Sequence, residues 1–298
     1  INTHAGNDVV VGDSGQATFN PTNNQLVSIQ TIDPTRGATD KINTHADHDT
    51  VLGGAGGDTI NTSDGNDIVL GDNGQATFRD DGTTISITTS DPDVGAADTI
   101  HTQNGADIVI GGTAGDTITT GTDASGDTSR DIVLGDNGNA TFDSQGRIDT
   151  IESTDTDIGG EDHITTGGGP DIVLAGTDKD TVLTESGNDI VVGDSGQATF
   201  NSDKDANMAA ENIGNLRTIN TITPAVGDND AITTDEGSDI VIGGANSDTI
   251  NTYLADEDQW DYVLGDNGTI TFEVDGSIQS ITTSDPDVGA ADTIHTQN

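Results

Sequence analysis

The feature that most constrains this chain is a nine-residue unit that recurs along almost its whole length. Each unit has six turn-forming residues, rich in Gly, Asn and Asp, and then three residues of strand type. The clearest copy is residues 53–61, Gly-Gly-Ala-Gly-Gly-Asp-Thr-Ile-Asn, and residues 62–70 form the next unit without a gap. A short fixed period of this kind predicts a stacked architecture in which each unit contacts only its neighbours.

An aspartate at the sixth position defines the register of the repeat. Eighteen units carry it, and each has an Ile or Val two residues later. Six extra residues precede Asp131 and four precede Asp261. The aspartates are Asp8, Asp40, Asp49, Asp58, Asp67, Asp98, Asp107, Asp116, Asp131, Asp162, Asp171, Asp180, Asp189, Asp230, Asp239, Asp248, Asp261 and Asp292.

A longer period lies above the nonapeptide. Four nonapeptides form a cassette, as at 35–70, and inserts that begin Gly-Asp-(Asn/Ser)-Gly separate the cassettes. The inserts span 12–34, 71–92, 135–156, 193–224 and 265–286. We therefore divide one continuous solenoid into units 1–43, 44–101, 102–165, 166–233, 234–295 and 296–298. Residues 86–104 and 280–298 are identical, so we expect the chain to be a fragment of a longer array.

The strand residues of the nonapeptide predict the fold class. Side chains alternate along a strand, so the middle residue of each triplet should point inward and its two neighbours outward. Two units make one coil of eighteen residues, and stacked coils give two parallel sheets around a thin aliphatic core. We expect an all-β parallel β-roll or β-helix solenoid. Each insert holds two β-type segments around a polar stretch, which fits a projecting hairpin and an elongated coil equally well.

The charge balance limits the partners of the chain. Asp and Glu total 53 against 8 Lys and Arg, for a net charge of −45. Self-repulsion on this scale opposes a compact state unless cations neutralise it. Nucleic acid is not expected as a partner because no basic patch exists to neutralise phosphates. No cysteine is present to form disulfides, and no apolar run is long enough to span a membrane.

Calcium is the cation that the turns suit best. It takes six to eight oxygen ligands, and a Gly-rich turn that ends in Asp offers main-chain carbonyls and a carboxylate. Two turns stacked eighteen residues apart supply enough oxygens, which predicts at least about eight sites. Magnesium demands stricter octahedral geometry, and zinc and copper prefer nitrogen or sulfur ligands. The predicted pairs are Asp40/Asp58, Asp49/Asp67, Asp98/Asp116, Asp107/Asp131, Asp162/Asp180, Asp171/Asp189, Asp230/Asp248 and Asp239/Asp261, with Asp13, Asp72, Asp136, Asp194 and Asp266 as further donors.

Residues 53–61 match the Gly-Gly-x-Gly-x-Asp-x-U-x nonapeptide completely. On these repeats, and over nearly the whole chain outside the inserts, the sequence resembles the repeats-in-toxin (RTX) family, as found in large secreted bacterial surface proteins and adhesins. Most other copies lack one or more glycines, as at 44–49 and 175–180. The resemblance implies a chain that is unfolded in the calcium-poor cytoplasm and folds outside the cell or at its surface.

We interpret the other residues that recur at fixed positions as structural and not catalytic. We expect the six histidines to be solvated, and we find no nucleophile–base set, catalytic residue or cofactor-binding residue. Phe19, Phe78, Phe142, Phe200 and Phe272 share one insert position and form either local core or a stripe for lateral association. Threonines that open a nonapeptide are expected to point outward. They form either an ordinary solvated strand surface or a flat ladder that binds ice or another regular solid surface. These residues are Thr44, Thr62, Thr102, Thr120, Thr166, Thr234, Thr252 and Thr296.

Together these features predict a calcium-binding structural segment of an extracellular fibre or cell-surface stalk, not an enzyme. Its expected partners are further copies of the same array or self-association into fibres, with no membrane span. One alternative is the stalk or ligand-binding region of a giant RTX adhesin, including one that binds ice or another surface. Another is the export and folding module of a secreted enzyme.

Overall fold

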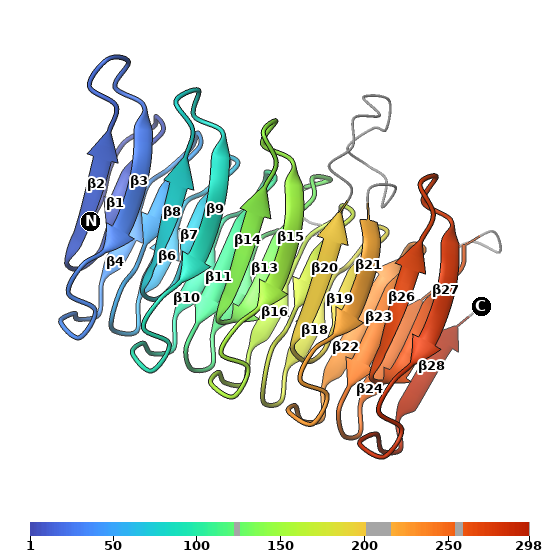
Figure 1. The fold of residues 1–298 in the computed structure, drawn as a ribbon. Helices are drawn as coiled ribbons and strands as arrows, with labels where there is room; N and C mark the ends of the chain where they lie inside the picture. The colour runs from blue at the N-terminus through green and yellow to red at the C-terminus, as the bar shows by residue number, and fades with distance from the viewer. Residues whose placement is uncertain (122–125, 201–215, 254–258, 298) are drawn as a thin grey trace.

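The chain folds into three β-sheets that run side by side along one long axis (Figure 1). The computed structural model describes residues 1–121, 126–200, 216–253 and 259–297, and these contain no helix. Two sheets are parallel with nine strands each, and the third is antiparallel with ten. Within each sheet the strands follow one another in chain order, so the expected all-β parallel solenoid is confirmed.

The two parallel sheets, named here the central sheet and the outer sheet, receive alternate strands of the chain. The central sheet contains β1 (Val9–Val11), β5 (Thr50–Leu52), β7 (Ile68–Leu70), β11 (Ile108–Gly112), β13 (Ile132–Asp136), β17 (Ile172–Leu174), β19 (Ile190–Val192), β23 (Ile240–Gly244) and β25 (Tyr262–Asp266). The outer sheet contains β4 (Lys41–Asn43), β6 (Thr59–Asn61), β10 (Thr99–His101), β12 (Thr117–Thr119), β16 (His163–Thr165), β18 (Thr181–Leu183), β22 (Ala231–Glu236), β24 (Thr249–Tyr253) and β28 (Thr293–Gln297).

A coil is one central strand, a turn, one outer strand and a second turn. In the complete copy, β5 leads through residues 53–58 into β6, and residues 62–67 lead into β7. Gly54 and Gly56 have φ angles of 105° and 124°, which side chains other than glycine rarely allow. The glycines of the repeat therefore permit a chain reversal within six residues.

A first apolar core lies between the outer and central sheets. It consists of the Ile or Val that stands two residues after each repeat aspartate, as expected from the sequence. Ile60 and Ile118 from the outer sheet face Val69 and Val109 from the central sheet, and all four are fully buried. Each coil adds one residue from each sheet, so this core has the same width along the molecule.

The central sheet is also buried on its other face, which corrects the expectation that both strand neighbours point outward. Leu52, Leu70 and Leu134 pack in a second core against Ile87 and Ala140 of the third sheet. Most central strands therefore contain an apolar triplet, as in Ile-Val-Leu at 68–70, whereas outer strands read Thr-Ile-Asn at 59–61. Continuous apolar triplets are typical of strands that are covered on both faces.

The inserts form hairpins, and these join into the third sheet, named here the hairpin sheet. Its strands are β2 (Gly15–Phe19), β3 (Leu26–Thr31), β8 (Gly74–Phe78), β9 (Thr84–Thr89), β14 (Gly138–Phe142), β15 (Ile148–Ser153), β20 (Gly196–Phe200), β21 (Leu216–Thr221), β26 (Gly268–Phe272) and β27 (Ile278–Thr283). β9 pairs with β8 of its own hairpin and with β14 of the next. The choice that the sequence left open is thus settled in favour of the hairpin. The unit boundaries drawn from the sequence stay a prediction.

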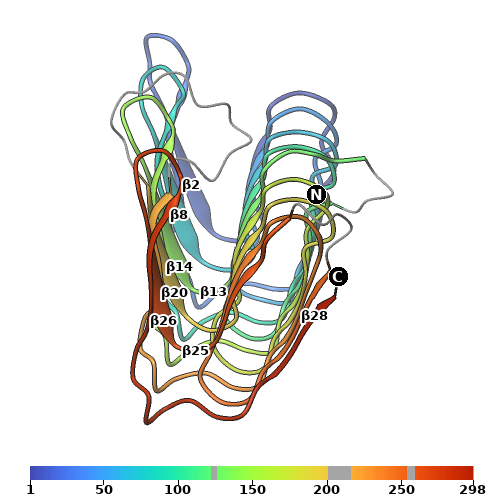
Figure 2. The ribbon, with the colours of Figure 1, turned by 90° about the vertical axis from the view of Figure 1, so that its right-hand side faces the viewer.

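The hairpin phenylalanines contribute to the second core. Phe78, Phe200 and Phe272 are 5–8% exposed, which confirms the local-core interpretation for them, whereas Phe19 is 44% exposed. Figure 2 shows the hairpin sheet leaning away from the stacked coils toward the hairpin tips. The molecule therefore has three layers: the hairpin sheet, the central sheet and the outer sheet.

Candidate metal sites

The turns form two rows along the solenoid, and each row holds nine of the eighteen candidate aspartates. The glycine row, in which turns lead from central to outer strands, contains Asp40, Asp58, Asp98, Asp116, Asp162, Asp180, Asp230, Asp248 and Asp292. The threonine row, in which turns lead from outer to central strands, contains Asp8, Asp49, Asp67, Asp107, Asp131, Asp171, Asp189, Asp239 and Asp261. The structure thus places the candidates at two parallel corners of the roll.

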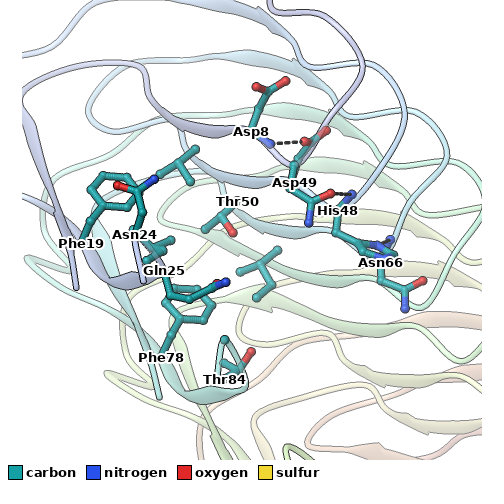
Figure 3. A pocket seen from close by; sticks show the side chains of 15 residues that line it. Asp8, Phe19, Asn24, Gln25, His48, Asp49, Thr50, Asn66, Phe78 and Thr84 are labelled. Atoms are coloured by element: carbon teal, nitrogen blue, oxygen red, sulfur yellow. Dashed lines mark hydrogen bonds between the residues drawn. The ribbon is translucent and has the colours of Figure 1, made fainter. Parts of the chain in front are cut away.

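Hydrogen bonds join the aspartates of each row into a ladder. Except in the last coil of each row, the main-chain N–H of each aspartate donates to Oδ1 of the aspartate in the next coil, at 2.6–3.1 Å. Figure 3 shows the first bond of the threonine row, from Asp8 to Asp49 at 2.8 Å. All eight predicted pairs are neighbours. The ladders also continue across the inserts, as from Asp58 to Asp98, which the eighteen-residue spacing did not indicate.

The second oxygen of the carboxylates has no comparable donor. In the described part of the chain, Oδ2 is buried without a hydrogen-bond partner in fourteen of the eighteen aspartates, among them Asp98, Asp116 and Asp180. An ionised carboxylate buried in this way costs several kcal/mol unless a counter-charge meets it. The ladders therefore present rows of buried oxygens that are suited to a cation.

Burial and mutual repulsion raise the pKa values of these carboxyl groups. Burial, and next the neighbouring Asp116, raise the pKa of Asp98 to about 10. Burial and the charges of Asp162 and Asp230 raise the pKa of Asp180 to about 11. In the threonine row, burial raises the pKa of Asp67 to about 7, and the Thr62 hydroxyl opposes this rise. Without a cation, the innermost carboxyl groups of the glycine row retain protons at neutral pH.

Eight of the nine turns of the glycine row open with a glycine, and ladder oxygens approach that glycine too closely for a side chain. A Cβ placed on Gly111 would lie 2.3 Å from Oδ2 of Asp116 and 2.2 Å from the carbonyl oxygen of Gly135 in the next coil. Equivalent positions along the row lie 2.0–2.8 Å from an aspartate Oδ2. The absence of a side chain therefore lets a carboxylate oxygen and a carbonyl oxygen from successive coils approach the main chain of the opening glycine.

The insert aspartates that the sequence suggested as further donors are held by main-chain amides. Asp72 Oδ1 accepts the N–H of Ala96 at 3.2 Å, and its Oδ2 accepts the N–H of Thr113 at 2.6 Å. Asp136 likewise accepts the N–H of Gly160 at 2.9 Å. These carboxylates fasten each hairpin to the glycine-row turns and bring negative charge to the row. Asp72, for example, contributes to the raised pKa of both Asp98 and Asp116.

Main-chain oxygens form a large part of the environment of the candidate sites. Within the described ranges, no three His, Asp or Glu side chains converge as the ligands of a metal ion. Oδ2 of Asp58 and the carbonyl oxygen of Gly71, for example, both lie close to the main chain of Gly53. The prediction that particular aspartates bind the metal remains a prediction. The structure joins the aspartate oxygens into ladders. The main-chain carbonyl oxygens of the opening glycines lie beside these ladders.

The threonines that open the threonine-row turns are buried, which corrects the expectation that they point outward. Thr3 Oγ1 donates a hydrogen bond of 2.5 Å to Asp8 Oδ2, five residues later. An opening threonine stands two residues after the inward residue of the outer strand, so strand alternation turns it inward, as Ile250 and Thr252 of β24 show. Thr44, Thr62, Thr102, Thr120, Thr166, Thr234 and Thr252 are 0–1% exposed, and Thr296 alone of the named set is exposed. The spacing Thr-x-x-x-x-Asp was the sequence signal for this contact.

A cavity of about 400 Å³ lies between the first two hairpins and the threonine row (Figure 3). Phe19 and Phe78 line one side, and Asp49 and His48 line the other. Nδ1 of His48 accepts the N–H of Asn66 at 2.8 Å, and Oδ1 of Asp49 accepts the N–H of Asp8. These polar groups hold neighbouring turns together.

Comparison with known proteins agrees with the repeat seen in the turns. A family model for the RTX calcium-binding nonapeptide repeat, in four copies, matches residues 1–18, 44–77, 95–125, 159–199 and 225–254, just over half of the chain. The matched segments contain fourteen of the eighteen ladder aspartates, so the match follows the candidate turns. No curated protein and no solved structure matched the chain.

Proposed function

Because the chain belongs to the family of RTX calcium-binding nonapeptide repeats, we propose that it is a rigid spacer of an extracellular fibre or cell-surface stalk. The family makes it a calcium-binding repeat region of a secreted protein. The spacer folds when Ca²⁺ binds after export. Its buried, unpartnered Oδ2 oxygens are the observation that carries this proposal, since the coils stack only if their charge is neutralised.

The chain's own residues prepare the sites by orienting the carboxylates. Each ladder hydrogen bond fixes Oδ1 of an aspartate and leaves Oδ2 near the carbonyl oxygens of the opening glycines. Asp116 beside Gly111 and Gly135 is an example. Bound Ca²⁺ would supply the positive charge that lets these carboxyl groups lose their protons and lets successive coils approach. Binding free energy then becomes folding free energy.

A spacer role follows from the way the molecule grows. All three sheets extend in chain order, and each coil adds about 4.8 Å to the long axis. Length is therefore proportional to the number of coils, and both cores continue through every coil. A secreted protein gains reach from such a segment without changing its cross-section.

The alternatives have less support from particular residues. The flat threonine surface rested on side chains that are buried, so we do not propose ice binding. The RTX repeat is a structural calcium-binding repeat, and an export module of an enzyme has no specific residue in its favour. A membrane-crossing helix of sufficient length and apolarity is missing from the described segments.

Chelation tests the proposal directly. Far-ultraviolet circular dichroism and small-angle X-ray scattering of the purified chain should show an extended β-structured rod in millimolar Ca²⁺. They should show an expanded, largely unstructured chain after exhaustive chelation, with Mg²⁺ as the control cation. A rod that persists unchanged in metal-free buffer would contradict the coupling of folding to calcium. Compact, globular particles in electron micrographs of the calcium-loaded protein would contradict the spacer role.

A further inference from the structure

The first strand position of the central sheet departs from the repeat in one coil. Val9, Thr50 and Ile68 lie in register at this position of β1, β5 and β7, and the six coils after Thr50 all carry isoleucine. Ile172 and Ile190, for example, are 1% and 2% exposed and pack in the second core. Threonine is shorter than isoleucine and ends in a hydroxyl group, so Thr50 leaves space between the central sheet and the hairpins.

The tip of the first hairpin departs from the repeat as well. Residues 20–25 read Asn-Pro-Thr-Asn-Asn-Gln and contain no charged side chain, whereas the described tips of the other hairpins each contain an acidic residue. Asn24 and Gln25 of this tip and Thr50 of the central sheet line the same cavity of about 400 Å³ (Figure 3). Two departures from the repeat, separate in the sequence, thus meet at one place.

Several polar groups of the cavity wall lack a partner within the residues that the structure describes. Thr50 is only 8% exposed, and its hydroxyl forms no hydrogen bond there. His48 accepts the N–H of Asn66 at Nδ1, so the neutral ring carries its hydrogen on Nε2, which has no acceptor. The Nδ2 groups of Asn7 and Asn66 also donate to no described group. Leaving polar groups of a partly enclosed wall unpaired is unfavourable, so these groups are available to a ligand.

The opposite wall is aromatic, and the mouth of the cavity is held in place. Phe19 and Phe78 line that wall, across from His48 in Figure 3. Nδ2 of Asn20 donates to Oδ1 of Asp80 at 2.9 Å, and Nδ2 of Asn23 donates to the main-chain oxygen of Asp80 at 2.8 Å. These two bonds join the tips of the first and second hairpins. The cavity is therefore formed before a ligand arrives, which lowers the entropic cost of binding.

The lining selects a neutral ligand that is rich in hydroxyl groups. The amide of Gln25 and the hydroxyl of Thr84 both donate and accept hydrogen bonds, as sugar hydroxyls do. The Phe78 ring offers an apolar surface to the C–H face of a sugar ring. Asp8 and Asp49 border the cavity, so an anionic ligand would meet like charge. The volume lies in the range of small-molecule sites, about 300–1,000 Å³.

We propose that the cavity between the first two hairpins binds a neutral saccharide, either a free sugar or the end of a longer glycan. The inference goes beyond the spacer role and does not depend on it. A chain that folds without calcium would contradict the proposed function and leave this site in place.

Ligand-observed NMR of the full chain, folded in millimolar Ca²⁺, tests the site with sugars of different charge. Glucose, galactose, mannose and N-acetylglucosamine are the neutral probes, with glucuronate as the anionic control and glucosamine as the cationic one. We expect saturation transfer to at least one neutral probe and weaker transfer to both charged controls. No transfer to any neutral probe, or stronger transfer to a charged control, would overturn the proposal.

The variant Thr50→Ile tests whether binding occurs in this cavity. It fills the space with the side chain that six other coils carry at this position, so the variant should fold and unfold at no lower urea concentration than the wild type. We expect Kd to rise by at least about tenfold, because the ligand loses its space. The control Thr181→Ile makes the same change at an exposed position of β18 and should keep the wild-type Kd. Wild-type affinity in folded Thr50→Ile would refute the assignment.

The variant Gln25→Ala tests the polar wall and changes no buried residue. We expect Kd to rise by about threefold to tenfold, the effect of losing one hydrogen bond. Gln145→Ala, at the exposed tip of the third hairpin, is the matched control and should bind as the wild type does. An equal Kd for the two glutamine variants would contradict the role of the first tip in the site.

Discussion

Removing calcium should reverse the way in which the stability of this protein depends on pH. Without metal, burial keeps the pKa of Asp98 and Asp116 at about 10 and that of Asp180 at about 11, whereas an unfolded aspartate titrates near 3.9. A carboxyl group whose pKa is raised by folding stabilises the fold when protonated. That contribution is complete below about pH 4 and is lost progressively as the pH rises toward the folded pKa.

The magnitude follows from the pH interval. Each pH unit above the unfolded pKa costs about 1.36 kcal/mol per group, so one such aspartate destabilises the metal-free fold by roughly 4 kcal/mol at pH 7. Three of them cost roughly 12 kcal/mol, which is comparable to the whole stability of a typical domain, about 5–15 kcal/mol. The metal-free chain should therefore be unfolded at pH 7 and gain β-structure toward pH 5.

Thermal unfolding followed by circular dichroism from pH 4.8 to 8, with chelator and with millimolar Ca²⁺, measures this dependence. The lower limit stays above the isoelectric point of about 4.1, where the chain would precipitate. With chelator, Tm should fall as the pH rises. With Ca²⁺ it should fall as the pH drops, because protons compete for the ligands. A chelated sample whose stability is constant or rises between pH 5 and 7 would refute the reasoning.

Three further predictions concern the core, the hairpin anchor and the choice of cation. Ile118→Ala in the first core should lower the free energy of unfolding in Ca²⁺ by about 2–5 kcal/mol, as measured by urea titration. The control Thr117→Ala, at an exposed neighbour, should lower it by less than about 0.5 kcal/mol. Equal effects of the two variants would argue against the two-sheet core. Asp72→Ala removes the acceptor of the Ala96 and Thr113 amides. The free energy of unfolding from urea titration should therefore fall by about 1–3 kcal/mol, while the number of bound ions stays unchanged. Loss of an ion would instead make Asp72 a ligand. Mg²⁺ at equal concentration should leave the chain largely unfolded by circular dichroism, because its stricter geometry fits this mixed oxygen set poorly; full folding in Mg²⁺ would contradict a calcium-specific site.

The nonapeptide allowed much of this fold to be predicted because one residue type recurs at each structural position. The sixth-position aspartates marked the corners of the roll, and the residue two places later marked the first core, as Ile60 and Ile118 show. The hairpin sheet was harder to foresee, since β9 and β14 lie about fifty residues apart and pair only once the coils have stacked. The inward direction of Thr62 follows strand alternation, because Thr62 stands two residues after the buried Ile60, just as Thr252 follows Ile250 in β24.

The hairpins also explain how nearly identical coils find one register. A parallel stack of nonapeptides could slip by one coil and still align aspartates with aspartates and Ile or Val with Ile or Val. Such a slip would separate Asp72 from the amides of Ala96 and Thr113. It would also move the hairpin that contains Phe78 and Ile87 off its position on the central sheet.

A register is strongly specified where a slip would expose a buried face. Each hairpin forms through local contacts and pairs with the hairpins on both sides, as β8–β9 does between β3 and β14. Because local pairs close at a smaller entropic cost than strands separated by forty or fifty residues, the hairpins can form first and then align the coils. Under the proposed function calcium lets the coils stack, and we expect the hairpins to determine which coils stack on which.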